Sequence, residues 1–327
     1  MADSAFTGSA TAKTDGFPPS LAIDLVGVTE AAAVAAAGQI GRGDERRAHD
    51  LAAEAMADAL SRLAVRGHVA IGEQEGSGGP LDIGGTVGHG KGPALDVALD
   101  PLEGATLTAK AMDGALSVIA VATEGGILRL PRVYMDKIAI GPGFAPGTVD
   151  LDRPPADNVR ALAGAKGVSA DAIVVCVLDR PRNARLIAEL RQAGARIRMI
   201  SDGDIAGVIT TTEPEAGVDM YLGSGGAAEG VLAAAALKCA GGFFQGRLGI
   251  RNEEERRRVS DAGVDDLDRI YALDDLVKGE VLFAATGVTR GALLNGVMRR
   301  DERIDTHSLV MDSAQGVIRR LRTRRRG

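Results

Sequence analysis

The chain has 327 residues, of which 45% are hydrophobic and 3% aromatic, and its formal net charge is −6. This length allows a large core in one or two domains, built mainly from Ala, Val, Leu and Ile, and the acidic balance argues against broad nucleic-acid binding. The two cysteines are too few and too far apart for a disulfide framework. No apolar stretch approaches the ~20 residues of a membrane span, and the N-terminus does not have the pattern of a secretory signal. These features predict a cytoplasmic protein without a membrane partner.

The N-terminal elements lead to a candidate acidic residue. Residues 1–19 are small and polar and end in proline, which predicts a disordered tail. Residues 21–38 have helical spacing, and Asp44 is a candidate N-cap for a second helix reaching about residue 64. A short strand over residues 68–72 then delivers Glu73, and the Gly-rich residues 74–92 predict a hairpin or lid.

The most informative motif is DPLEG at residues 100–104, at the end of a predicted strand over 94–100. Pro101 cannot continue a central strand, so we expect a turn that aims Asp100 and Glu103 into one pocket. Two carboxylates repel unless a cation neutralises them, and oxygen ligands suit Mg²⁺ or Mn²⁺. Gly104 permits close approach of a ligand, and a helix beginning there would offer N–H groups to a phosphate.

For this motif alone an ordinary turn with solvated acids is an equal alternative. Strand, paired acids, glycine and helix start together favour a metal-dependent phosphatase. Further strands are expected over 115–122 and 134–140, and residues 141–155 form the clearest linker.

Beyond the linker, strands alternate with helices, which predicts an α/β fold with parallel strands and crossover helices. The mixed charges over 252–258 indicate a solvated helix face. Residues 319–326 are strongly basic and predict a last strand with a solvated end, with contact to RNA or an acidic neighbour as the alternative. The expected strand–helix pairs are strand 173–178 with helix 181–193, strand 196–200 with a helix from about residue 203, and strand 218–222 with helix 228–238. Two late strands are expected over residues 281–285 and 308–311.

The same chain contains GRGD at 41–44, IGEQE at 71–75, YMDK at 134–137, DGD at 202–204 and GGAAEG at 225–230. In this order and spacing it resembles the class II fructose-1,6-bisphosphatases, within the lithium-sensitive sugar and inositol phosphatase superfamily, over about residues 21–320. The GRGD and GGAxEG motifs are the more specific ones. The resemblance implies a layered α/β/α/β/α sandwich, a metal-binding phosphatase half over 20–150, a sugar-phosphate-binding half over 151–327, and a homo-oligomer of two or four chains.

The resemblance also implies the metal ligands. It carries over Glu73, Asp100, Glu103 and Glu229 directly, and the first two end strands whose carboxyl edges can share a pocket. The family's helix aspartate falls on His49, beside Asp50, which lies about 100° further round the helix. Histidine can ligate Mn²⁺ or Zn²⁺ but suits Mg²⁺ poorly.

Substrate binding is implied for residues of both halves. Asp202 and Asp204 flank Gly203 and are placed to accept hydrogen bonds from sugar hydroxyls. Arg180 and Arg182 occupy the place of the family's distal-phosphate residues, where guanidinium groups suit bidentate contact. The remaining implied substrate contacts are Glu103, Gly104, Ala105, Tyr134 and Gly226.

Several catalytic positions depart from the family pattern. Ala105 replaces the threonine thought to position the attacking water, although Thr106 follows it. Glu45 replaces the lysine after GRGD, with Arg46 next, and Ser77 replaces an aspartate. Losing one positioned hydrogen-bonding group can cost ~10²–10³ in rate.

The implied function is Mn²⁺- or Mg²⁺-dependent hydrolysis of the 1-phosphate of fructose 1,6-bisphosphate, in gluconeogenesis or a sugar-phosphate cycle. Glu73, Asp100, Glu103 and Thr106 are the candidate catalytic residues. Three alternatives stay open: activity on sedoheptulose 1,7-bisphosphate, a phosphatase for a different substrate with His49 selecting another metal, and a catalytically impaired paralogue that binds a sugar phosphate.

Overall fold

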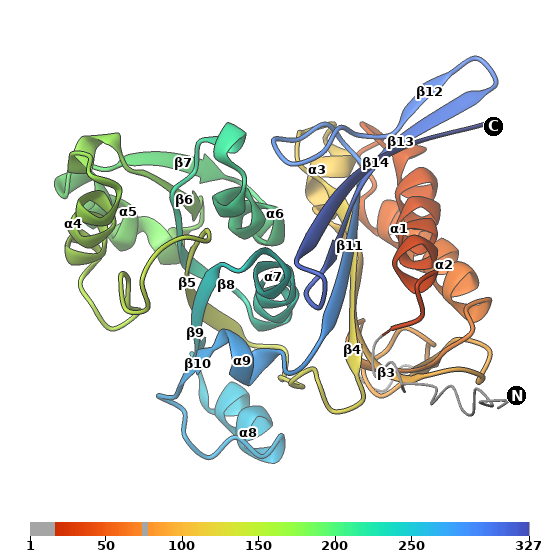
Figure 1. Ribbon diagram of the computed structural model, residues 1–327, viewed down its shortest axis with the longest axis horizontal. Helices are drawn as coiled ribbons and strands as arrows, with labels where there is room; N and C mark the ends of the chain where they lie inside the picture. The colour runs from red at the N-terminus through yellow and green to blue at the C-terminus, as the bar shows by residue number, and fades with distance from the viewer. Residues whose placement is uncertain (1–16, 74–77, 327) are drawn as a thin grey trace, which may run out of the picture.

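A computed structural model describes residues 17–73 and 78–326. Most of the predicted tail over residues 1–19 and the position of Ser77 lie outside these residues. The fold is mixed α/β and has the expected five layers: two helices, a sheet, two helices, a second sheet and two more helices (Figure 1).

The first sheet has eight strands within the described residues, in the order β12-β13-β11-β4-β3-β1-β2, with β14 paired to β13. Helices α1 and α2 pack on its outer face, where their buried side chains form one core cluster with β3 and β4. Asp44 caps α2 as predicted, because its carboxylate accepts a 2.9 Å hydrogen bond from the Arg47 N–H. The bounds are α1 Leu21–Ala37, α2 Glu45–Ser61, β1 Arg66–Ile71, β2 Thr86–Val87, β3 Ala94–Glu103, α3 Ala105–Ala109, β4 Leu116–Thr123, β11 Val281–Gly287, β12 Met298–Arg300, β13 Arg303–Asp312 and β14 Val317–Arg326.

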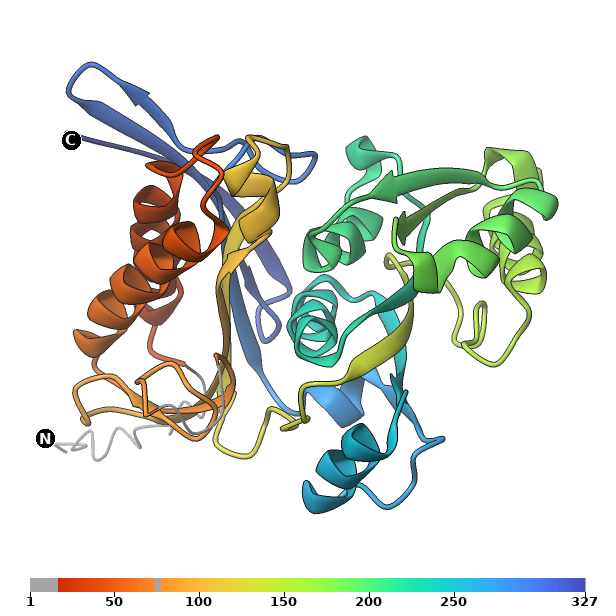
Figure 2. The ribbon, with the colours of Figure 1, turned by 180° about the vertical axis from the view of Figure 1, so that it is seen from behind.

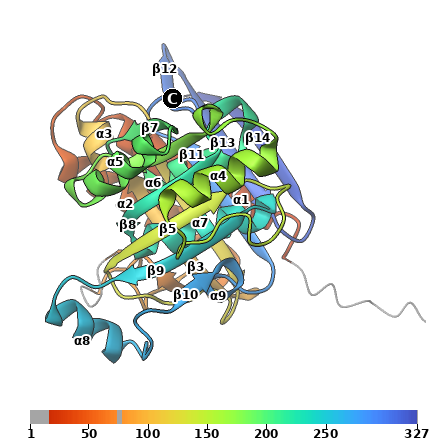
Figure 3. The same ribbon diagram turned by 90° about the vertical axis from the view of Figure 1, so that its left-hand side faces the viewer.

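The second sheet has the order β10-β9-β5-β8-β6-β7. The predicted parallel pairing holds where β6 joins β7 and β8, whereas β5 runs antiparallel to β8 and β9, so the sheet is mixed. Helices α4 and α5 cover its outer face (Figure 3). The bounds are β5 Tyr134–Ile140, α4 Pro155–Lys166, β6 Val174–Leu178, α5 Ala184–Gln192, β7 Arg196–Ile200, β8 Met220–Gly226, β9 Phe243–Gly249, α8 Glu253–Asp261, β10 Ile270–Ala272 and α9 Leu273–Leu276.

Helices α6 (Asp204–Ile209) and α7 (Ala227–Ala240) lie between the sheets (Figure 2). Helix α7 is buried around its whole circumference, because seven of its fourteen residues are alanines, which allow close approach on both sides. A helix that is apolar all round belongs in the interior of a protein. This central layer brings the ends of strands from both sheets to one region.

The expectation that the chain turns away from the sheet at Pro101 is wrong. Strand β3 continues to Glu103, and its register with β4 shifts between Asp100 and Glu103. Pro101 is tolerated because it lies in this bulge, beyond Ala98, where pairing with β1 ends. Proline is accepted at bulges and unpaired edges for this reason.

The basic C-terminal segment forms the predicted last strand, β14, paired with β13 over its whole length. Arg322 and Arg324 bind Asp305 on β13, and Arg320 reaches Glu213 at 2.7 Å. Sheet membership does not follow the proposed boundary at residue 150, since β5 precedes it and β11 to β14 return to the first sheet. No helix among the described residues is long and apolar enough to cross a membrane.

Candidate active site

A cleft of about 480 Å³ lies where the first sheet meets α7 and the start of α6. Its acidic residues come from the segment after β1, the bulge of β3, the start of α6 and the first turn of α7, and His49 is contributed by α2. The structure thus brings together all of the residues predicted to bind metal, which are His49, Glu73, Asp100, Glu103 and Glu229. Gly104, Tyr134, Asp202, Asp204 and Gly226 from the predicted substrate set line it as well.

The β3 bulge sets the direction of the two motif carboxylates. Asp100 Oδ1 accepts a 2.9 Å hydrogen bond from the Leu102 N–H, which occupies one carboxylate oxygen. Glu103 Oε1 accepts a 2.6 Å hydrogen bond from the Ile205 N–H in α6. Its other oxygen, Oε2, is buried without a hydrogen-bond partner among the described residues. A buried unpaired carboxylate oxygen is costly unless something absent from the protein chain satisfies it.

Crowding of these acids disfavours their charged forms. Burial, with the charges of Glu229 and Glu73, raises the pKa of Asp100 to about 7. Burial, followed by the charges of Asp204 and Asp100, raises the pKa of Glu103 well above its ordinary value. The pKa of Glu229 is raised chiefly by burial and by Asp204. A divalent cation would reverse this balance by stabilising the ionised carboxylates.

His49 lies against a second predicted ligand. Its Nε2 is 3.1 Å from Glu73 Oε1, and this hydrogen bond raises the pKa of the imidazole. When Nε2 donates to Glu73 it cannot also bind a metal, so this geometry favours His49 as a positioning residue for the Glu73 carboxylate. Asp50, the alternative from the same helix, is 61% exposed and does not line the cleft.

The two glycines that open the GGAAEG motif are required because acidic side chains lie close to their Cα atoms. A Cβ on Gly226 would lie 1.9 Å from Glu229 Oε2, so this glycine leaves room for the carboxylate to fold back over the start of α7. A Cβ on Gly225 would lie 2.0 Å from Asp204 Oδ2 and 2.8 Å from Lys137 Nζ. Each glycine thus accommodates one buried acidic group.

Lys137 is a residue that the sequence analysis quoted but did not assign. It is 1% exposed, forms an ion pair with Asp204 and donates a 2.9 Å hydrogen bond to the Gly226 carbonyl. Asp204 therefore has a structural partner in addition to the sugar contact proposed for it. The signal for this role was the position of Lys137 in β5, where it shares the buried run of residues 137–140 with three apolar residues.

The cleft lining is not only acidic: it includes two arginines that sequence reasoning missed, Arg132 and Arg251. The guanidinium carbon of Arg251 lies 3.8 Å from the centre of the Tyr134 ring, and that of Arg182 lies 4.3 Å from it. Such stacking holds a guanidinium in place. Arg251 Nη2 also donates a 2.8 Å hydrogen bond to Glu255 Oε1, and Arg182 Nε donates a 2.9 Å hydrogen bond to the Ser224 carbonyl, so each keeps only part of its guanidinium for an anion. Arg251 was missed because β9, whose end it follows, was not predicted.

Some predicted residues are absent from the cleft lining that the described residues form: Ala105, Thr106, Arg180, Arg182 and Gly203. Arg180 lies 3.9 Å from Asp202 and so reaches the edge of the site. Burial raises the pKa of Asp202, and the nearby charge of Glu45 adds to this effect. The departure at Glu45 thus makes the edge of the cleft more acidic.

The described side chains do not form a compact group of three or more His, Cys, Asp or Glu residues ready to enclose a metal ion. The donor chemistry nevertheless fits a hard divalent cation, because oxygen ligands dominate and Glu103 Oε2 lacks a partner.

Comparison with known proteins gives a consistent result. The family model described as bacterial fructose-1,6-bisphosphatase, glpX-encoded, matches residues 19–325. The chain is 39% identical over 318 residues to fructose-1,6-bisphosphatase 1 class 2 of Escherichia coli (strain K12), covering 93% of this chain and 94% of that protein. The class 2 enzyme of Shigella flexneri matches with the same identity and coverage.

Proposed function

The chain belongs to the bacterial, glpX-encoded fructose-1,6-bisphosphatase family, and on this premise we propose that its cleft hydrolyses fructose 1,6-bisphosphate at the 1-phosphate. The products are fructose 6-phosphate and inorganic phosphate. The protein is a phosphatase of carbohydrate metabolism. The observation that carries this proposal is that one cleft holds both a group of acidic residues and two arginines, Arg132 and Arg251.

Family membership implies an enzyme that depends on a divalent metal. Asp100, Glu103, Glu73 and Glu229 are the residues that would hold it, and their oxygen donors favour Mg²⁺ or Mn²⁺. When bound, the ion lowers the pKa of a coordinated water and stabilises charge on the phosphoryl group.

The protein's own groups bind and orient the substrate. Two arginines of the cleft, Arg132 and Arg251, attract the distal phosphate, and Arg251 is held in place by stacking on Tyr134. Asp202 accepts a hydrogen bond from a sugar hydroxyl. Gly104 lines the cleft and has φ of 90°, a left-handed conformation that glycine adopts readily and that turns the chain from β3 into α3. The His49 side chain holds Glu73 toward the cleft through the 3.1 Å hydrogen bond.

The alternative of a catalytically impaired paralogue rests on the position at which the family has a threonine hydroxyl to orient the attacking water. Ala105 occupies that position in the family pattern, and Thr106 does not line the cleft formed by the described residues. We therefore expect turnover to be slower than in a relative that keeps the threonine. We do not expect a different reaction, since the acidic residues and the arginines of the cleft are both present.

Phosphate release from a panel of substrates tests the proposal. We expect hydrolysis of fructose 1,6-bisphosphate with Mn²⁺ or Mg²⁺, a smaller rate with Zn²⁺, and no rate with excess chelator. Asp100→Asn is the matched inactive control. Preference for sedoheptulose 1,7-bisphosphate would reassign the substrate, and binding of the sugar phosphate without release under every metal would establish the impaired paralogue instead.

Oligomeric state and compartment stay predictions. We propose a homodimer or homotetramer, to be measured by light scattering coupled to gel filtration. The reduced, cytoplasmic setting agrees with Cys176 and Cys239 being free and buried.

A further inference from the structure

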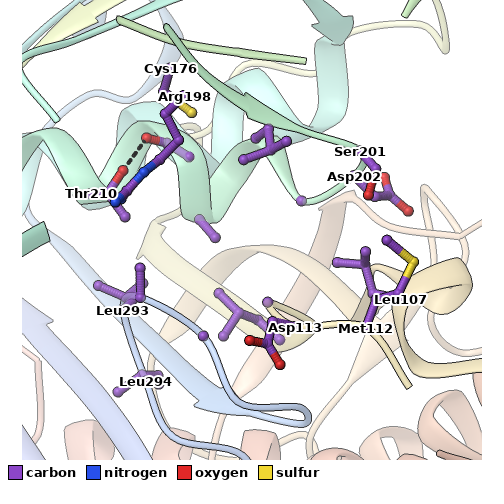
Figure 4. A pocket seen from close by; sticks show the side chains of 18 of the residues that line it. Leu107, Met112, Asp113, Cys176, Arg198, Ser201, Asp202, Thr210, Leu293 and Leu294 are labelled. Carbon is purple, nitrogen blue, oxygen red and sulfur yellow. Dashed lines mark hydrogen bonds between the residues drawn. The ribbon is translucent and has the colours of Figure 1, made fainter. Parts of the chain in front are cut away.

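A second cavity, of about 290 Å³, lies between α3 and α6. One wall comes from α3, the loop after it and the loop between β11 and β12, and the other from β6, β7 and α6. Figure 4 shows Leu107, Met112 and Asp113 across the cavity from Arg198 and Asp202. Among lining residues, Asp202 alone is shared with the cleft. The proposed reaction gives this cavity no role.

The cavity has an apolar interior and an exposed apolar rim. Leu107, Leu293 and Leu294 are buried and face the space between the walls (Figure 4). Met112 and Met199 are 39% and 41% exposed and lie on opposite walls. Exposed apolar groups gathered at a cavity mark a binding surface, and methionine adapts its shape to a ligand.

The charged groups at the cavity determine where the anionic group of a ligand would bind. Arg198 has no acidic partner within the described part of the chain, and its Nη1 donates a 2.8 Å hydrogen bond to the Ala216 carbonyl. Its remaining N–H groups are free to bind an anion. Asp113 and Asp202 lie toward the opposite end (Figure 4), so an anionic group is favoured only beside Arg198.

The walls of this cavity are also the supports of the active site. Helix α3 begins directly after Gly104, and α6 begins directly after Gly203. A Cβ on Gly203 would lie 3.7 Å from the Gly114 carbonyl and 3.8 Å from Leu107 Cδ1, so even the smallest side chain there would bring the two walls into contact. The Glu103–Ile205 hydrogen bond, 2.6 Å long, joins the same two supports on the cleft side. A ligand that separates the walls strains this bond.

We propose that this cavity is a regulatory site for a small organic monoanion with an apolar body of one or two rings. The anionic group binds Arg198, the body packs against the leucines and the two methionines, and occupancy lowers phosphatase activity by separating α3 from α6. A space near 300 Å³ is at the lower end for ligand sites, so a two-ring body fills it and presses on both walls. The coupling rests on the proposed phosphatase function, whereas the binding does not.

Calorimetric titration with naphthalene-1-sulfonate, a two-ring aromatic monoanion, tests the binding. We expect saturable binding of about one molecule per chain, weakened about tenfold or more by Arg198→Gln and abolished by Ala292→Trp, which fills the cavity from an exposed loop position. Arg196→Gln is the matched control, because Arg196 is an exposed neighbour on β7 that does not line the cavity. Circular dichroism melts confirm that each variant is folded. Equal binding by the parent and all three variants overturns the site.

The coupling is tested with the same probe at saturation. We expect kcat/KM for fructose 1,6-bisphosphate to fall at least about twofold in the parent and the Arg196 variant, and to stay constant in Ala292→Trp. Calorimetric affinity for the bisphosphate gives a second measure of coupling if the protein proves to be an impaired phosphatase. Binding of the probe at this cavity with no change in either measure overturns the regulatory role.

Discussion

The substitution Gly226→Ala isolates the role of one carboxylate in the active site. Gly226 has φ of −70° and ψ of 150°, which alanine adopts readily, so the backbone gives no reason for the position to be glycine. The obstacle is Glu229, because the new Cβ would lie 1.9 Å from Oε2 and 2.6 Å from Cδ. The clash is with the far end of a flexible side chain, which can move without unfolding the protein.

The displacement can be worked out from these distances. Ordinary contact begins at 3.4 Å, so the carboxylate must move by about 1.5 Å. A misplacement of ~1 Å in a catalytic constellation can cost ~10²-fold in rate. We therefore expect kcat/KM for fructose 1,6-bisphosphate to fall about 10²-fold and the apparent metal affinity to weaken, while the melting temperature changes little.

The assay is phosphate release across a Mn²⁺ titration, with Gly164→Ala in α4 as the matched control. A Cβ on Gly164 meets nothing within 4 Å, so this change should be neutral or slightly stabilising. Gly226→Ala should add no further loss in a Glu229→Ala background, because its effect acts through that side chain. Unchanged activity in Gly226→Ala, or full additivity in the double variant, would refute the reasoning.

The other predictions concern stability, pH, the anion site and turnover. Lys137→Met should destabilise the fold by about 3–5 kcal/mol, since it leaves Asp204 buried without its ion-pair partner; a denaturant melt showing less than ~1 kcal/mol would contradict this. The pKa of Asp100 rises from 3.8 to about 7 on folding, so between these pH values the folded state binds a proton that the unfolded state does not. The stability of the metal-free protein should therefore fall as the pH rises from about 4 to 7. Melting temperatures measured in chelator from pH 4 to 8 should show this decrease, and Asp100→Asn should make it smaller. Arg251→Ala should raise KM about tenfold for the bisphosphate and much less for a monophosphate, and equal effects on both would exclude a distal-phosphate contact. Ala105→Thr should raise turnover about tenfold with little change in substrate affinity if the missing hydroxyl limits the parent, and a constant turnover would show that it does not.

The sequence alone determined the chemistry of the site and much of the local structure. Asp44 capped its helix and the Gly-rich approach to Glu229 was significant, because both effects act within a few residues of the chain. The motif carboxylates shared one cleft, as their positions near strand ends predicted. The layered α/β order also followed from the motifs and from strands alternating with helices, since these patterns are set by short-range rules.

Only the tertiary structure decided how those groups are held. Lys137 pairs with Asp204 across 67 positions of sequence, and Glu103 meets the Ile205 N–H across 102. No local pattern encodes such partners, because they depend on how two sheets pack around α7. The same packing placed Arg251 in the cleft, carried β3 through Pro101 on a bulge, and left a cavity between α3 and α6. Side-chain identity thus fixed which chemistry was available, and the long-range contacts fixed where each group could act.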